Sequence, residues 1–172
     1  MPVNVSVHGT TTVVEIDRPE RRNALDGPTL GGIGAAFAAA EADDAIRAVV
    51  LTGAGADAFC AGADLRATGA DRSPPAGSPS IDVFTTRCYP KPVIAAVNGA
   101  AVGGGFELVL AADLVVAAEH ATFSVPEVKR GLVGGQHQLE APADRGAVHG
   151  GDHRLRVAAR REHVDARAAC RW

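Results

Sequence analysis

Three consecutive glycines, Gly103–Gly105, separate two apolar segments in the stretch VIAAVNGAAVGGGFELVLAADLVV at residues 93–116. Glycine costs about 0.5–1 kcal/mol relative to alanine inside a helix or strand, so three in a row are unfavourable in regular structure. They are expected where a side chain would obstruct a close approach. The order of buried strand, small residues and helix start therefore predicts a site at which a ligand can reach the backbone.

A second stretch has the same layout. In VVLTGAGADAFCAGADL (49–65) a buried strand opens into small residues that end at Ala61–Asp64. Backbone N–H groups from two such junctions, one of them at a helix start, could converge on one carbonyl oxygen as an oxyanion hole. Glycine-rich turns also serve as plain packing devices, and this alternative stays open. The dinucleotide fingerprint G-x-G-x-x-G and the phosphate-loop sequence are absent from both stretches.

Strand and helix patterns alternate before residue 134, which predicts an α/β fold. Short β-branched runs at 3–7 and 12–16 predict a hairpin, and the alanine-rich stretch 27–46 predicts a helix. Buried strands are expected at 47–53 and 92–99. The segment 106–118 should begin as a helix and pass into a strand near 114–117, and 66–80 is expected to be a loop rich in Pro, Gly and Ser.

Composition excludes several classes of function. The 172 residues carry a net charge of −3, so no basic surface for nucleic acid or an anionic membrane is expected. The cysteines (Cys60, Cys88 and Cys170) lack metal-ligand spacing. His149 and His153 have the i, i+4 spacing of metal ligands but lie in an Ala/Arg-rich segment, so no metal is predicted. With no secretory signal and no apolar run of transmembrane length, the chain is expected in the cytoplasm.

The composition changes near residue 134. Ala, Arg, Gly and His supply 24 of the 39 residues from 134 to 172, whereas all five Phe lie before that point. The segment 134–172 shows no sustained helical or strand period. Two regions are therefore expected: a core at 1–133 and a divergent, poorly structured tail at 134–172.

Several motifs together resemble the enoyl-CoA hydratase/isomerase (crotonase) family. They are IDRPERRNALD, FCAGADL and KPVIAAVNGAAVGGGFELVLAADLVVAAEHATFSVPEVKRGLV, in the order and approximate spacing of the family. The resemblance runs from about residue 3 to 133. It implies a spiral of ββα units with two nearly perpendicular sheets. It also implies an acyl-CoA thioester ligand and no metal or redox cofactor.

The resemblance assigns roles to individual residues. It implies an oxyanion hole made by the backbone N–H groups of Ala63 and Gly104. Glu107 and Glu127 match the two hydratase carboxylates, of which the first would orient and deprotonate water and the second would exchange a proton at C2. Without the resemblance, Glu107 is better explained as a first-turn helix residue favoured by the helix dipole, and Glu127 could equally be a helix-start residue. The remaining positions are implied for substrate and CoA binding: Arg22, Ala61, Gly62, Asp64 and Gly103. Asp64 and Asp113 could also be caps or loop anchors, and Cys60 is expected to be structural.

The resemblance ends after KRGLV (129–133), where the family continues into a helical C-terminal region that builds much of a trimer interface. The composition of the tail suggests a frameshifted or truncated family member. The sequence therefore predicts an enoyl-CoA hydratase of fatty-acid oxidation, with a homotrimer or hexamer implied by the family. The alternatives are a sister activity such as isomerisation, or an inactive remnant that at most binds CoA.

Overall fold

The computed structural model describes residues 1–67, 73–74, 76–86 and 88–130. They form an α/β fold with a five-stranded and a three-stranded sheet. The strands are β1 (Val3–His8), β2 (Thr11–Ile16), β3 (Ala48–Gly53), β4 (Ala58–Cys60), β5 (Val93–Val97), β6 (Ala100–Val102), β7 (Leu114–Ala117) and β8 (Thr122–Ser124). The helices are α1 (Gly27–Ala42), α2 (Asp82–Thr85) and α3 (Gly104–Leu110), with 3₁₀ turns η1 (Pro19–Arg21) and η3 (Glu127–Arg130).

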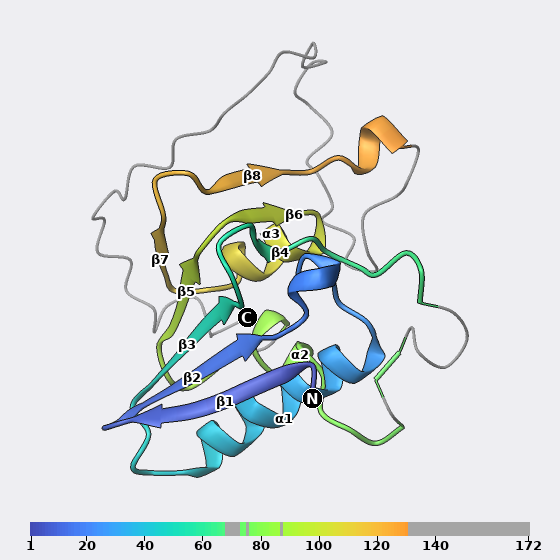
Figure 1. The fold of residues 1–172 in the computed structure, drawn as a ribbon. Helices are drawn as coiled ribbons and strands as arrows, with labels where there is room; N and C mark the ends of the chain where they lie inside the picture. Colours follow the sequence, from blue (N-terminus) through green and yellow to red (C-terminus); the bar gives the residue numbers. More distant parts are fainter. Residues whose placement is uncertain (68–72, 75, 87, 131–172) are drawn as a thin grey trace, which may run out of the picture.

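The chain advances in repeated turns, each of which gives one strand to each sheet. The larger sheet has the order β1-β2-β3-β5-β7, and the smaller has the order β4-β6-β8. Except for the antiparallel hairpin β1–β2, all strand pairs are parallel. Figure 1 shows the strands of the smaller sheet crossing the direction of the larger one, at the end toward which β2, β3 and β5 point. This is the two-sheet spiral of ββα units that the resemblance implied.

The core lies between the larger sheet and α1. Residues of β2, β3 and β5 alternate between buried and half-buried positions, as expected for strands with one face against a core. Phe37 of α1 is fully buried and stacks on Phe84 of α2 with ring centroids 4.3 Å apart. Asp26 caps the start of α1 by accepting the Thr29 N–H at 2.9 Å. The core thus fixes the strand ends from which the site loops leave.

The structure confirms the expected hairpin, the strands at 47–53 and 92–99, and the helix-to-strand change between α3 and β7. Helix α1 ends at Ala42, four residues before the predicted end at residue 46, because the Asp43 carboxylate accepts the Ala45 N–H and turns the chain. The described residues of 66–80 contain no helix or strand, as predicted for a loop. The predicted tail at 134–172 lies outside the described residues.

Candidate active site

The loop after β4 is held by backbone hydrogen bonds to the segment 22–25. The Ala61 N–H donates to the Arg22 carbonyl at 3.0 Å. The Leu25 N–H donates to the Gly62 carbonyl, and the Asp64 N–H donates to the Leu25 carbonyl, both at 2.8 Å. In a trans peptide the C=O and N–H point to opposite sides. Because the Gly62 carbonyl points at Leu25, the Ala63 N–H points away from it.

The start of α3 meets this loop. Gly62 has φ +81, and a Cβ there would lie 3.1 Å from the Gly104 nitrogen and 2.7 Å from the Val102 carbonyl oxygen. A Cβ on Gly104 would lie 3.9 Å from the Ala63 nitrogen. Within the described part of the chain, neither the Ala63 N–H nor the Gly104 N–H donates to an acceptor. Two unpaired N–H groups therefore lie close together, one of them at a helix N-terminus.

Glycine is required at the other two positions of the triplet, Gly103 and Gly105, for different structural reasons. Gly103 adopts φ +54 and ψ −123, a region open almost only to glycine, and its N–H donates to the Ser124 carbonyl at 2.9 Å. A Cβ on Gly105 would overlap the Cys60 carbonyl oxygen and lie 2.8 Å from the Cys60 carbonyl carbon. Gly105 therefore lets α3 pack directly on β4, so only part of the triplet faces a potential ligand.

Glu127 lies against the start of α3. A Cβ on Gly103 would collide with Glu127 Oε1. The second oxygen of this carboxylate, Oε2, is buried and has no hydrogen-bond partner among the described residues. An unpaired buried carboxylate oxygen is unfavourable, and such groups concentrate at sites where another molecule completes the hydrogen bonding.

Glu107 lies in the first turn of α3 and its side chain is exposed. Its own N–H donates to the Gly103 carbonyl at 3.0 Å. Gly103 is therefore contacted by the backbone of Glu107 and by the carboxylate of Glu127.

A groove of about 290 Å³ has Ala63 among its lining residues. Three residues predicted for CoA binding line it, namely Arg22, Ala61 and Asp64, whereas Gly62 does not. The full lining is Glu20, Arg21, Arg22, Ala24, Ala61, Ala63, Asp64, Leu65 and Arg66. Arg22 is exposed and has a left-handed backbone with φ 53. Three arginines on one groove suit an anionic ligand such as a phosphate. Gly103, Gly104, Glu107 and Glu127 lie outside this lining.

The side chain of Asp64 turns into the protein. Its Oδ2 accepts from Arg18 Nη2 at 3.0 Å, and its Oδ1 accepts from the Arg66 N–H at 3.0 Å. Burial raises the pKa of this carboxyl, but the hydrogen bonds from the Arg66 N–H and from Arg18 outweigh it, so the pKa lies below its ordinary value. Asp64 is therefore a loop anchor, one of the alternatives that the sequence left open, and it also lines the groove. Asp113 is also an anchor, because its Oδ2 accepts the Val93 N–H at 2.8 Å.

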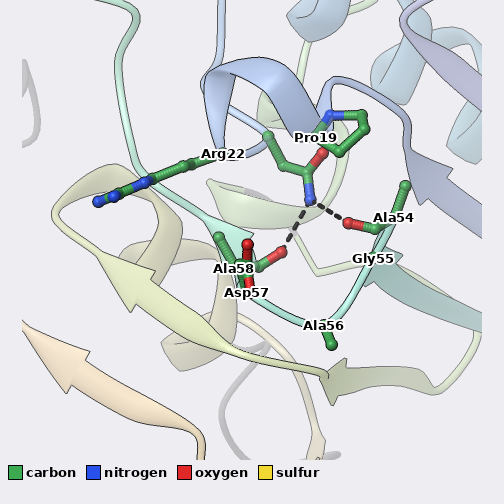
Figure 2. Close-up of a pocket in the computed structure, with 8 residues that line it drawn as sticks. Pro19, Arg22, Ala54, Gly55, Ala56, Asp57 and Ala58 are labelled. Carbon is green, nitrogen blue, oxygen red and sulfur yellow. Dashed lines mark hydrogen bonds between the residues drawn. The ribbon is translucent and has the colours of Figure 1, made fainter.

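Two residues that hold the site loops through hydrogen bonds, Arg18 and Asn23, were not singled out from the sequence. Arg18 reaches Asp64 across 46 residues of sequence, which no local pattern indicates. Asn23 is fully buried with φ 54, and its amide donates to the carbonyls of Ala54 at 3.0 Å and Ala58 at 2.8 Å. Ala54 and Ala58, whose carbonyls accept these bonds, line a small cavity of about 40 Å³ and are labelled in Figure 2. Asn23 thereby ties the loop between β3 and β4 to the segment that also holds Ala61.

Cys60 is fully buried, and burial raises the pKa of its thiol to about 12. Its Sγ accepts the Gly62 N–H at 3.4 Å, which fits the structural role expected for it. Among the described residues no three His, Cys, Asp or Glu side chains gather as a metal site, and His149 and His153 lie outside them. Nor does this part of the chain contain a helix long and apolar enough to cross a membrane.

The fold and this pair of strand-to-loop junctions define a crotonase-type protein. A family model described as enoyl-CoA hydratase/isomerase matches residues 7–141. The chain belongs to the enoyl-CoA hydratase/isomerase family.

Curated relatives that the chain matches include proteins named carnitinyl-CoA dehydratase. The chain is 43% identical over 129 residues to the carnitinyl-CoA dehydratase of Salmonella arizonae, covering 73% of this chain and 49% of the relative. It is 39% identical over 134 residues to the carnitinyl-CoA dehydratase of Proteus mirabilis, covering 76% of this chain and 51% of the relative. The chain thus spans about half the length of the curated relatives it matches.

Solved structures of named hydratases also match this chain. The carnitinyl-CoA hydratase of Mycobacterium avium superposes with a TM-score of 0.70 at 43% identity, covering 77% of this chain and 52% of that one. The enoyl-CoA hydratase of Bacillus anthracis gives a TM-score of 0.66 at 33% identity, covering 78% of this chain and 54% of that one.

Proposed function

We propose that this chain carries the hydration site of an enoyl-CoA hydratase, a lyase that adds water across the 2,3 double bond of a 2-enoyl-CoA. One observation carries the proposal: the unpaired N–H groups of Ala63 and Gly104 lie close together beside the Glu127 carboxylate. Donors fixed in this way stabilise the negative charge that develops on a thioester oxygen during addition. The family and its relatives support the same class of reaction.

The residues divide the chemistry as follows. The Ala63 and Gly104 N–H groups bind the thioester oxygen and withdraw electron density from C3. Glu107 holds the water and removes its proton as the hydroxyl adds to C3, and Glu127 delivers a proton to C2. One water is consumed for each thioester, and the step leaves Glu107 protonated and Glu127 ionised. Transfer of that proton from Glu107 to Glu127 then restores the starting protonation for the next turnover. The groove with Arg21, Arg22 and Arg66 would take the phosphates of CoA.

A second substrate is favoured by a specific observation. The curated relatives quoted above are named carnitinyl-CoA dehydratase, and a structure at 43% identity is named carnitinyl-CoA hydratase. Carnitinyl-CoA is a 3-hydroxyacyl thioester with a quaternary ammonium group, and its dehydration is the reverse of the same reaction type. Comparing kcat/KM for crotonyl-CoA hydration with kcat/KM for carnitinyl-CoA dehydration decides between the two substrates.

The oxyanion hole can be tested by changing Gly104, the first residue of α3. Proline is well tolerated at that helix position but lacks the N–H, so Gly104→Pro removes the donor while the helix is kept. We expect this variant to lose about 10²–10³-fold in hydration rate. Gly104→Ala keeps the N–H, and its Cβ would meet Gly62 Cα at an ordinary 3.7 Å, so it should retain most of the activity.

Equal rates for the two Gly104 variants would contradict the assignment of the hole. Isomerisation without hydration would indicate a sister activity of the family. A folded chain that binds CoA but converts neither thioester would indicate the remnant. Assembly into a homotrimer or hexamer, a cytoplasmic location and independence from a cofactor stay predictions.

A further inference from the structure

Arg18 joins the loop after β4, which carries the Ala63 N–H, to the segment 22–25, which fixes the direction of that N–H. The guanidinium is largely buried, with 14% of its side chain exposed. Its Nη1 donates to the Ala24 carbonyl at 2.6 Å, and its Nη2 lies 3.0 Å from both Asp26 Oδ2 and Asp64 Oδ2. The Arg18 side chain therefore contacts Ala24, which precedes Leu25, and Asp64, which follows Ala63.

The two joined segments are the ones that determine where the Ala63 N–H points. Leu25 accepts from the Asp64 N–H and donates to the Gly62 carbonyl, so the Gly62–Ala63 peptide can rotate only if these two bonds move. The clamp made by Arg18 and Asp64 holds both partners of this pairing. A displacement of about 1 Å in such a donor can cost on the order of 10²-fold in rate.

We infer that Arg18, acting through Asp64, is a positioning residue for the oxyanion donor at Ala63. This inference rests on the proposed function. Neither side chain touches the thioester carbonyl; each acts by holding the peptide that does. The alternative is an ion pair that only stabilises the start of α1, where Asp26 is the capping residue.

Kinetics can distinguish positioning from a lost CoA contact. Asp64→Ala should lower kcat for crotonyl-CoA by about 10–100-fold while KM stays within about threefold, because the loop loses its anchor but the groove remains. Asp64→Asn keeps the size of the side chain but has one acceptor oxygen in place of two. It can keep either the bond from Arg18 or the bond from the Arg66 N–H, so it should restore only part of kcat. The double variant Arg18→Met/Asp64→Ala should be no slower than Asp64→Ala, since both changes break one clamp.

Asp26→Asn is the matched control. It removes the charge of the other carboxylate that contacts Arg18 Nη2, yet asparagine can still cap α1. The control should keep kcat near the unsubstituted value. A kcat loss in Asp26→Asn as large as in Asp64→Ala would overturn the inference, because the start of α1 would then explain both.

A direct readout is the absorption of bound cinnamoyl-CoA, a conjugated 2-enoyl thioester. Hydrogen bonds to its carbonyl shift the absorption to longer wavelength, so the shift at saturation reports the oxyanion donors without turnover. We expect a clear shift in the unsubstituted chain and in Asp26→Asn, and less than half of that shift in Asp64→Ala. A full shift in Asp64→Ala would overturn the inference and leave the proposed function intact.

If the unsubstituted chain fails to bind or to shift the thioester, the proposed function is wrong and the inference falls with it. Should Asp64→Ala fail to fold, Arg18→Lys decides. It keeps the charge but loses the planar fork that serves three acceptors. Arg18→Lys must then lower both the shift and kcat relative to Asp26→Asn, and equal values would overturn the inference.

Discussion

At the scale of single residues, the glycine triplet combines three different constraints. Gly103 has a backbone conformation with φ +54 and meets the Glu127 carboxylate, Gly104 offers an unpaired N–H, and Gly105 packs on the Cys60 carbonyl. The sequence predicted the close approach at these positions. It could not predict that Gly105 serves packing, because the contact depends on β4, which lies 45 residues earlier.

The packing role of Gly105 can be tested by its stability cost. Gly105→Ala places a Cβ 2.8 Å from the Cys60 carbonyl carbon, and the Cys60 backbone can move away only at a high energetic cost. We expect the free energy of unfolding to fall by about 2–3 kcal/mol or more, measured by urea denaturation.

Gly9→Ala is the control for this change. A Cβ on Gly9 meets nothing within 4 Å, although φ is +61, so the expected loss is about 1 kcal/mol from backbone strain alone. Equal losses for Gly105→Ala and Gly9→Ala would show that α3 can move away from β4.

At the scale of elements, the sequence predicted the helices and strands that are long enough to show a local residue pattern. The hairpin β1–β2, the strands β3 and β5 and the helix α1 were predicted correctly from their runs of β-branched, apolar or alanine residues. The three-residue strands β4, β6 and β8 are too short for any period, and they form because each pairs with another turn of the spiral. The resemblance supplied the second sheet, and the residue patterns alone did not.

The C-terminal end of α1 provides a test at this scale. Lys91 Nζ donates to the carbonyls of Ala40 at 2.5 Å and Asp43 at 2.6 Å, which are groups that the helix itself leaves unpaired. Lys91→Met should therefore lower the free energy of unfolding by about 1–2 kcal/mol.

Lys129→Met removes the same charge from an exposed position and should change the free energy of unfolding by less than about 0.5 kcal/mol. Urea denaturation of both variants provides the comparison. If Lys129→Met were as destabilising as Lys91→Met, net charge and not the helix end would be the cause.

At the scale of the whole molecule, the described residues include both the backbone donors and the glutamates of the proposed chemistry. They also leave apolar side chains exposed. Leu114 and Val116 point to one side of the strand β7 and are 60% and 65% exposed. Leu110, at the end of α3, is 67% exposed. Exposed apolar side chains in such numbers are typical of surfaces that other protein covers. The expected trimer or hexamer would be one way to cover them.

At this scale, the residues of the candidate site were predicted from the sequence, but the residues that hold its loops in place were not. Ala63, Gly104 and Glu127 came from the resemblance, and the structure brings their backbone and carboxylate groups near one another. Arg18 and Asn23 hold the loops that present them, through hydrogen bonds across 31 to 46 residues. Such long-range contacts depend on the spiral, so a linear pattern does not contain them.

The central claim is that Glu127 takes part in hydration beside the two backbone donors. The most direct test is the loss of the conjugated thioester absorbance of crotonyl-CoA on mixing with the purified chain, compared with Glu127→Gln. The account predicts hydration by the unsubstituted chain and a loss of at least about 10²-fold in Glu127→Gln, the low end for a general acid–base group. A folded chain that does not hydrate crotonyl-CoA, or a glutamine variant that is equally fast, would contradict it.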